Sequence, residues 1–107
     1  MTLAHNEIIL LGGGGHAKVL IDLINTSGQF EISGILDSQL QIETTVLNVP
    51  VLGDDDLLPG LYGKGIRNVC IAIGSVRDTV KRRILFDKVK QMGFFVPYLL
   101  HPQAIII

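Results

Sequence analysis

Short apolar segments alternate with longer amphipathic ones along this chain of 107 residues. The apolar segments suit strands that are buried on both faces, as the central strands of a parallel sheet are. In the amphipathic segments, apolar residues recur every three or four positions, which predicts helices that pack one stripe against a sheet. The pattern therefore predicts strands at 8–11, 31–36, 68–73 and 94–100 and helices at 16–25 and 76–91.

The helix expected over 16–25 has the clearest pattern. Gly28 follows its last turn, where glycine is favoured because it adopts a left-handed backbone without strain. One apolar stripe at positions i, i+3, i+4 and i+7 is formed by Ala17, Leu20, Ile21 and Ile24.

The helix expected over 76–91 is bounded by its own end signals. Ser75 is a suitable N-cap, and Asp78 three residues later resembles a capping box. Gly93 is expected to end the helix. Its inner face is expected to carry Val80, Ile84, Leu85, Val89 and Met92.

The middle of the chain has weaker periodicity. The segment 39–48 is expected to be a long loop, with room for one short strand, and 49–53 a brief extended element. Three acids, Asp54 to Asp56, are suited to begin a helix, and Pro59-Gly60 is expected to stop it quickly. The helix-start interpretation of these acids is preferred to a metal site.

Alternation of strands and helices predicts an α/β fold, a small Rossmann-like, doubly wound parallel sheet with right-handed crossovers. Ligands of such sheets bind at the carboxyl ends of the strands, near the point where the strand order reverses. Three features follow strand ends here: the four glycines Gly12 to Gly15, the pair Asp37-Ser38, and the pair Gly74-Ser75. A binding site is expected where they converge.

The glycines Gly12 to Gly15 lie between the first strand and the first helix. Backbone without Cβ atoms can approach a ligand closely and adopt positive φ. The amide groups that begin the following helix favour an anion, so a phosphate or diphosphate is the expected ligand. The alternative is a merely tight connection, for which one or two glycines would suffice.

The same residues permit a second interpretation. Gly12 to Ala17 fit the dinucleotide fingerprint G-x-G-x-x-A, and Asp37 lies where such folds place an acid for the ribose hydroxyls. An NAD-binding fragment of an oxidoreductase or redox sensor is therefore the alternative to a nucleotide-sugar domain. Both interpretations place a nucleotide on the loop.

Two further side chains are candidates for ligand contact. His16 opens the first helix, where a ligand contact is preferred to simple capping or to catalysis. Lys81 is expected within reach of the Gly74-Ser75 turn, although it also fits the solvated face of its helix. No hydroxyl or carboxylate forms a recognisable catalytic pair with His16, so no catalytic residue is assigned.

Composition narrows the class of protein. The formal charge is −1, which gives no electrostatic signature of nucleic-acid or anionic-membrane binding. No apolar run has the roughly 18 residues that a membrane span needs, and no signal peptide is recognisable, so a cytoplasmic protein is expected. Cys70 lies in an apolar strand and is expected to be buried. Three scattered histidines with one cysteine lack the spacing of a metal site.

Five ordered blocks make the chain resemble the amino-terminal domain of NeuD/PglD-type sugar acyltransferases. They span nearly the whole sequence, which is more specific than the glycine loop alone. The blocks are Gly12 to Val19, Gly34 to Asp37, Val49 to Gly53, Ile71 to Ser75 and Leu100 to Ala104.

The resemblance implies a Rossmann-like domain that binds a nucleotide-sugar acceptor. In that family a following left-handed β-helix binds acetyl-CoA, forms a homotrimer and supplies a catalytic histidine, and an amine or hydroxyl of the sugar is acetylated. By this resemblance the glycine loop and His16 would hold the UDP diphosphate, Asp37 and Ser38 the uridine, and Gly74-Ser75 the neighbouring edge. This domain would bind no cofactor itself.

Two departures from the family pattern bear on function. Lys81 stands where the family commonly carries arginine, which removes a bidentate phosphate contact. The chain also ends where the β-helix should begin, with three isoleucines, Ile105 to Ile107. Residues 1–103 are therefore expected to form the binding domain and 104–107 the start of a missing β-helix, which implies truncation and an inactive fragment.

Overall fold

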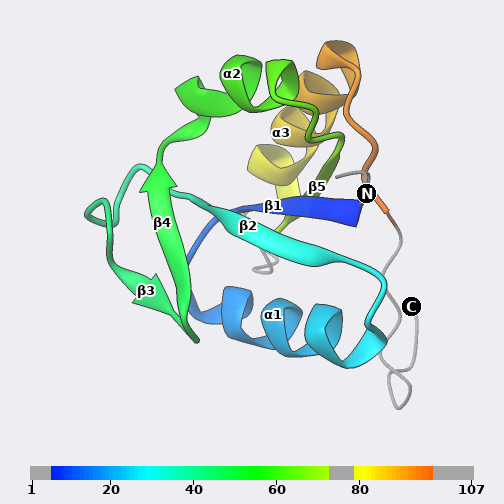
Figure 1. Cartoon of the computed structure of the whole chain (residues 1–107). Helices are drawn as coiled ribbons and strands as arrows, with labels where there is room; N and C mark the ends of the chain where they lie inside the picture. The colour runs from blue at the N-terminus through cyan, green and yellow to red at the C-terminus, as the bar shows by residue number, and fades with distance from the viewer. Residues whose placement is uncertain (1–5, 73–78, 98–107) are drawn as a thin grey trace.

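A computed structural model of the chain describes residues 6–72 and 79–97. It contains one five-stranded sheet with the strand order β3-β4-β2-β1-β5 (Figure 1). Every neighbouring pair is parallel except β3 and β4, which pair antiparallel. The strands are β1 (Glu7–Leu11), β2 (Glu31–Leu36), β3 (Thr45–Val46), β4 (Val49–Gly53) and β5 (Asn68–Ile71).

Helices cover both faces of this sheet. The helix α1 (Gly15–Ser27) lies on one face, and α2 (Leu58–Gly63) and α3 (Thr79–Met92) lie on the other (Figure 1). A short 3₁₀ turn, η2 (Asp55–Leu57), precedes α2. The expected Rossmann-like, doubly wound α/β fold is confirmed. In the part of the chain that the structure describes, no helix is long and apolar enough to cross a bilayer.

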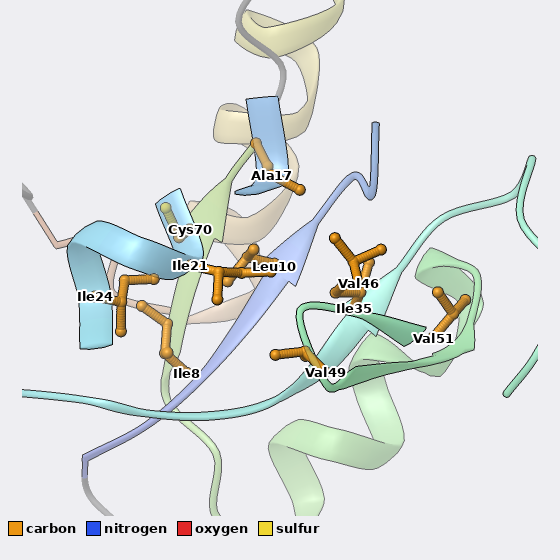
Figure 2. Close-up of a cluster of buried hydrophobic side chains, with 11 residues drawn as sticks. Ile8, Leu10, Ala17, Ile21, Ile24, Ile35, Val46, Val49, Val51 and Cys70 are labelled. Carbon is orange, nitrogen blue, oxygen red and sulfur yellow. The ribbon is translucent and has the colours of Figure 1, made fainter. Parts of the chain in front are cut away.

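The central strand β1 shows why its sequence is apolar at almost every position. Ile8 and Leu10 pack on the α1 side, whereas Ile9 and Leu11 belong to the core cluster on the opposite side. Each fully buried side chain of this size stabilises the fold by about 1.5–3 kcal/mol. Figure 2 shows the α1-side cluster, which Ile8 and Leu10 form with Ala17, Ile21, Ile24, Ile35, Val46, Val49, Val51, Cys70 and Ala72.

The inner face of α3 is narrower than the sequence predicts. Val89 is fully buried, but Val80 and Ile84 are 72% and 61% exposed. At 100° per residue these two side chains lie about 180° and 140° around the helix from Val89, on the side that faces solvent. The prediction that they are core residues is therefore wrong. In the described part of α3, Val89 belongs to the core cluster, Met92 packs against that cluster, and Leu85 is half-buried.

The prediction that Pro59-Gly60 stops the helix is also wrong. Both residues lie inside α2, and Pro59 is in its first turn. Proline is accepted there because the first amide groups of a helix need no partner within the helix. Asp54 does begin this segment as predicted, because its side chain accepts a hydrogen bond from the Asp56 amide at 3.0 Å.

The glycines that were predicted to end the two long helices do so, whereas the last predicted strand is shorter than expected. Gly28 (φ 69°) and Gly93 (φ 101°) are left-handed just after α1 and α3. The last expected strand is reduced, in the described residues, to a parallel bridge between Phe95 and Asn68. Its residues 98–100, and the expected helix start at 76–78, lie outside the described residues.

The segment 39–48 does contain a short strand, β3, joined to β4 by the two residues Leu47 and Asn48. Both have positive φ, 48° and 70°. This is the geometry of a type I′ hairpin turn, which asparagine and glycine favour. A leucine in this conformation is strained, and its side chain is 51% exposed, so burial offsets little of the cost.

We expect Leu47→Asn to raise the free energy of unfolding by about 1 kcal/mol, because asparagine tolerates the left-handed conformation. Urea denaturation would measure the change. Ile42→Asn is the matched control, since Ile42 is exposed in the same segment without a positive φ. An equal gain in both variants would mean that loss of surface apolarity, not backbone strain, is responsible.

Candidate functional site

The four parallel strands end at the same level. Leu11, the last residue of β1, is paired with Leu36 of β2 and with Ile71 of β5. Leu36 is in turn paired with Gly53, the last residue of β4. The segments that leave these strands therefore start side by side, at the edge where doubly wound sheets bind ligands.

Backbone hydrogen bonds continue this alignment one residue beyond the strands. Gly12 N donates to Leu36 O at 2.8 Å, and Asp37 N donates to Gly53 O at 2.7 Å. On the other side of β1, Ala72 N donates to Leu11 O at 2.8 Å. The glycine loop and Asp37 are thus brought together as predicted. Gly74 and Ser75, which follow Ala72 in the sequence, lie outside the described residues.

The glycine loop is closed on one side. Gly12 has φ 107°, a conformation that side chains rarely adopt. Gly13 is buried, and a Cβ atom there would lie 2.6 Å from Leu40 Cδ1 and 3.2 Å from Ile35 Cγ2. The backbone conformation therefore favours glycine at position 12, and a side chain at position 13 would force Leu40 to move.

The loop is open on its other side, at Gly14. This residue is exposed, and a Cβ atom built on it would meet nothing within 4 Å. Its φ of −75° is ordinary, and the positive φ that the sequence predicts for the loop is found at Gly12. Gly14 is the N-cap of α1 and has no side chain to cap the helix. A glycine is therefore not needed here for backbone geometry or for space.

The first amide groups of α1 point out of the helix at this open side. The first four amides of any α-helix lack an acceptor four residues earlier. Ala17 N donates instead to Gly14 O at 2.9 Å. The partial positive charge of the helix terminus adds to these donors. Gly15 and His16, the first two residues of α1, lie at this terminus, which is suited to an anion such as a phosphate.

Asp37 ties the loop to the segment that follows β2. Its Oδ2 accepts a hydrogen bond from Gly13 N at 2.7 Å, and its Oδ1 accepts one from Gln39 N at 2.7 Å. The side chain is half-buried. Both carboxylate oxygens are thus engaged with backbone, each with one further acceptor position available. Ser38 is exposed in the turn beside it.

A cleft of about 720 Å³ opens beside His16. It lies between α1, β5 and α3. Its floor is mainly apolar and two arginines stand in its wall, whereas Lys81 is not among the lining residues. The lining consists of His16, Leu20, Cys70, Ile71, Arg82, Arg83, Phe86, Asp87, Val96 and Pro97.

Sequence reasoning missed the two arginines of this cleft. Of the basic residues on this helix it selected Lys81, and neither Arg82 nor Arg83, for contact with an anionic ligand. The angular position of each residue around the axis of α3 is the signal that distinguishes the arginines from Lys81. Once Val89 is taken as the buried position, Arg82 lies on the flank next to the inner stripe.

Two other features of the site region have ordinary roles. The carboxylates of Asp54, Asp55 and Asp56 lie within 4.8 Å of one another. Asp54 caps η2, and Asp55 forms a 2.9 Å ion pair with Lys88 of α3. Cys70 is buried as predicted, and desolvation by burial raises the pKa of its thiol from 9.0 to about 11.

The model of the PglD N-terminal domain family matches residues 7–89 of the chain. The comparison with curated proteins found no match. Among solved structures, a mutant perosamine N-acetyltransferase from Caulobacter crescentus in complex with CoA and GDP-perosamine is 36% identical, with a TM-score of 0.83. The alignment covers 98% of this chain and 47% of that one.

A second similar structure is the acetyltransferase domain of PglB from Neisseria gonorrhoeae in complex with acetyl coenzyme A. It is 30% identical with a TM-score of 0.76, over 92% of this chain and 45% of that one. The Rex-family repressor RSP has a TM-score of 0.62 at 17% identity, over 95% of this chain and 51% of that one, which shows a shared fold alone. The chain spans about half the length of the solved structures it matches.

We expect the two central glycines of the loop to differ in their effect on stability. Gly13→Ala should lower the free energy of unfolding by about 1–3 kcal/mol, because the new methyl group overlaps Leu40 and Ile35. Gly14→Ala should change it by less than about 1 kcal/mol, since only the N-cap preference is lost. Urea denaturation of both variants checks this, and equal costs would contradict the one-sided closure of the loop.

We expect Cys70 to react slowly with a thiol reagent in the native protein. The rise in the Cys70 pKa from 9.0 to about 11 lowers the thiolate fraction at pH 8 by about a hundredfold. Labelling with a chromogenic disulfide, in the presence and absence of urea, measures the ratio of rates. Native labelling as fast as that of the unfolded chain would show that the thiol is accessible.

Proposed function

The chain belongs to the family of PglD N-terminal domains, and from this premise we propose that it binds the nucleotide-sugar acceptor of a sugar acetyltransferase. The observation that carries the proposal is the open side of the glycine loop at Gly14. A tight connection between β1 and α1 would explain Gly12, which has a positive φ, and Gly13, which lies against Leu40 and Ile35. It would not explain a glycine at a position with ordinary φ and free space, whereas a ligand on the loop would.

We assign the diphosphate of the ligand to the Gly12–Gly15 loop and to the start of α1 at His16. Helix N-termini hold phosphate through amide donors and the helix dipole, and a flat glycine surface lets the ligand approach them. The nucleoside would lie toward Asp37 and Ser38. Gly74, Ser75 and Lys81 remain proposed contacts at the neighbouring edge.

The cleft beside His16 extends this proposal to the rest of the ligand. His16 stands both at the proposed diphosphate position and in the cleft wall. A ligand held by its diphosphate would therefore enter the cleft with its remaining part. Arg82 and Arg83 supply donors there that suit oxygen atoms of an anionic or hydroxylated group.

In this proposal the domain contributes position rather than chemistry. Holding an acceptor in a reactive orientation replaces a bimolecular encounter with a pre-arranged one. The sugar amine or hydroxyl would attack the thioester of acetyl-CoA bound to a β-helix domain of a homotrimer, with a histidine of that domain as base. The described residues would bind no coenzyme. We propose a cytoplasmic location, where acetyl-CoA and nucleotide sugars occur.

The base of the nucleotide is the least constrained part of the proposal. The family resemblance suggested UDP, whereas one solved relative holds GDP-perosamine. NAD is the second candidate, because the G-x-G-x-x-A loop and Asp37 also fit a dinucleotide. Family membership favours the nucleotide sugar.

We expect UDP or GDP, and the corresponding nucleotide sugars, to bind the chain in calorimetric titration, and NAD to bind at least tenfold more weakly (about 1.4 kcal/mol). The loop and helix terminus bind a diphosphate, but a dinucleotide also needs a second nucleotide subsite. Fluorescence of NADH is an independent check on the alternative. Tight NAD binding without any response to UDP or GDP would overturn the proposal.

We expect Gly14→Val to abolish this binding while the fold is kept, because the side chain would fill the space assigned to the diphosphate. Gly60→Val on α2 is the matched control, since a Cβ atom there also meets nothing within 4 Å. Titration of both variants with UDP and GDP, after thermal melting to check folding, makes the comparison. Unchanged affinity in Gly14→Val would remove the loop from the site.

A further inference from the structure

The carboxylate and the amide of Asp37 are all hydrogen-bonded to backbone groups. Its two oxygens accept hydrogen bonds from Gly13 N and Gln39 N, each at 2.7 Å, and its own amide donates to Gly53 O at 2.7 Å. A single residue thus links the β1–α1 loop, the β2–β3 segment and the end of β4. Hydrogen bonds from amides to a carboxylate are about twice as strong as those between neutral groups.

The hydrogen bond from Gly13 N to Asp37 Oδ2 holds the part of the loop that has no side chain of its own. Gly12 has φ 107°, and Gly13 beyond it leaves the sheet with no side chain of its own to anchor it. On one side Gly13 lies against Leu40 and Ile35, and its amide is held by Asp37 Oδ2. The carboxylate and these apolar contacts together keep the opposite side, at Gly14, turned toward solvent.

We propose that Asp37 is a positioning residue, whose carboxylate holds the glycine loop in its anion-binding shape. This rests on the proposed function and assigns Asp37 a role that differs from the usual one of an acid at this position, which accepts ribose hydroxyls. Its effect on binding passes through the Gly13 amide, so it extends to ligands that contain no ribose or base.

The direction of the change in phosphate affinity, when the charge of Asp37 is removed, distinguishes the proposal from a ribose contact. A carboxylate close to an anion site repels the anion, so removing its charge should by itself raise affinity for phosphate. If Asp37 holds the loop, its loss should instead lower that affinity. Inorganic pyrophosphate is the suitable probe, because it has the charge of the diphosphate and lacks the nucleoside.

The variant Asp37→Asn keeps size and removes the charge. Its amide oxygen can accept from one backbone N–H, but its NH₂ group then faces the other donor. We expect the affinity for pyrophosphate to fall about tenfold or more, and the affinity for UDP or GDP to fall by a similar factor. NMR titrations of the wild type and the variant with each probe measure both ratios.

Asp54→Asn is the matched control. Asp54 makes the same kind of local bond, from the amide two residues later, at 3.0 Å, but it caps η2 and has no bond to the glycine loop. The control removes one negative charge from the same protein and should leave both affinities unchanged. An equal loss in both variants would attribute the effect to net charge or general destabilisation and overturn the proposal.

The outcomes separate this inference from the proposed function. If the wild type binds neither UDP nor GDP, the proposed function fails. If the wild type binds and Asp37→Asn binds pyrophosphate equally or more tightly while losing nucleotide affinity, then Asp37 contacts the nucleoside and the positioning role is wrong. Parallel losses for pyrophosphate and nucleotide support it.

A measurement on the wild type covers the case in which Asp37→Asn does not fold. The Gly13 amide donates a 2.7 Å, partly buried hydrogen bond to Asp37 Oδ2, so its hydrogen exchange should be slow in the purified protein. The exposed Gln39 amide is the internal comparison, because it bonds to the same carboxylate within a local turn. Exchange at Gly13 as fast as in an unstructured peptide would contradict the proposal.

Discussion

The position of β1 is the constraint on which the rest of this structure depends. The strand is paired on both edges, with β2 and β5, and covered on both faces by the two core clusters. The chain can therefore leave β1 only at the carboxyl edge of the sheet. There the loop must pass between the ends of β2 and β5 to reach α1, which places the glycines where the strand order reverses.

The narrow space at the ends of these strands accounts for two of the four glycines in the loop. Gly12 turns with a positive φ, and Gly13 lies in a space that Leu40 and Ile35 leave too small for a side chain. Gly14 has neither constraint. Serine or aspartate at this position would stabilise the fold, because its side chain would make an N-cap hydrogen bond. A glycine without that bond is the observation from which we propose a ligand surface at this position.

The sequence predicted most of the fold because its apolar pattern is strong where strands are buried on both faces. β2 and β4 have the predicted bounds, and α1 differs from its predicted range only at the ends. The pattern failed at α3, where Val80 and Ile84 are apolar but face solvent. Helical periodicity identifies a stripe, but several stripes are compatible with an apolar-rich helix, and only the sheet selects one.

The candidate site was predicted less completely, for a related reason. Strand ends can be counted along the sequence, so the convergence of the glycine loop with Asp37 was accessible. Which hydrogen bonds Asp37 makes was not, because a carboxylate at this position can serve either ligand or backbone. Arg82 and Arg83 were missed because their place in the cleft depends on the rotation of α3 about its axis.

The charges around the loop bear on how an anion would be selected. Among the described residues, the carboxylate of Asp37 is bonded to the glycine loop through the Gly13 amide, and its charge is negative. Attraction between net charges therefore contributes little there, and affinity has to come from directed amide donors and the helix dipole. Such donors favour the binding of an anion whose oxygens match their spacing and orientation. The arginines stand farther along, in the cleft beside His16, so in our proposal a ligand that spans both regions would gain more than a free phosphate would.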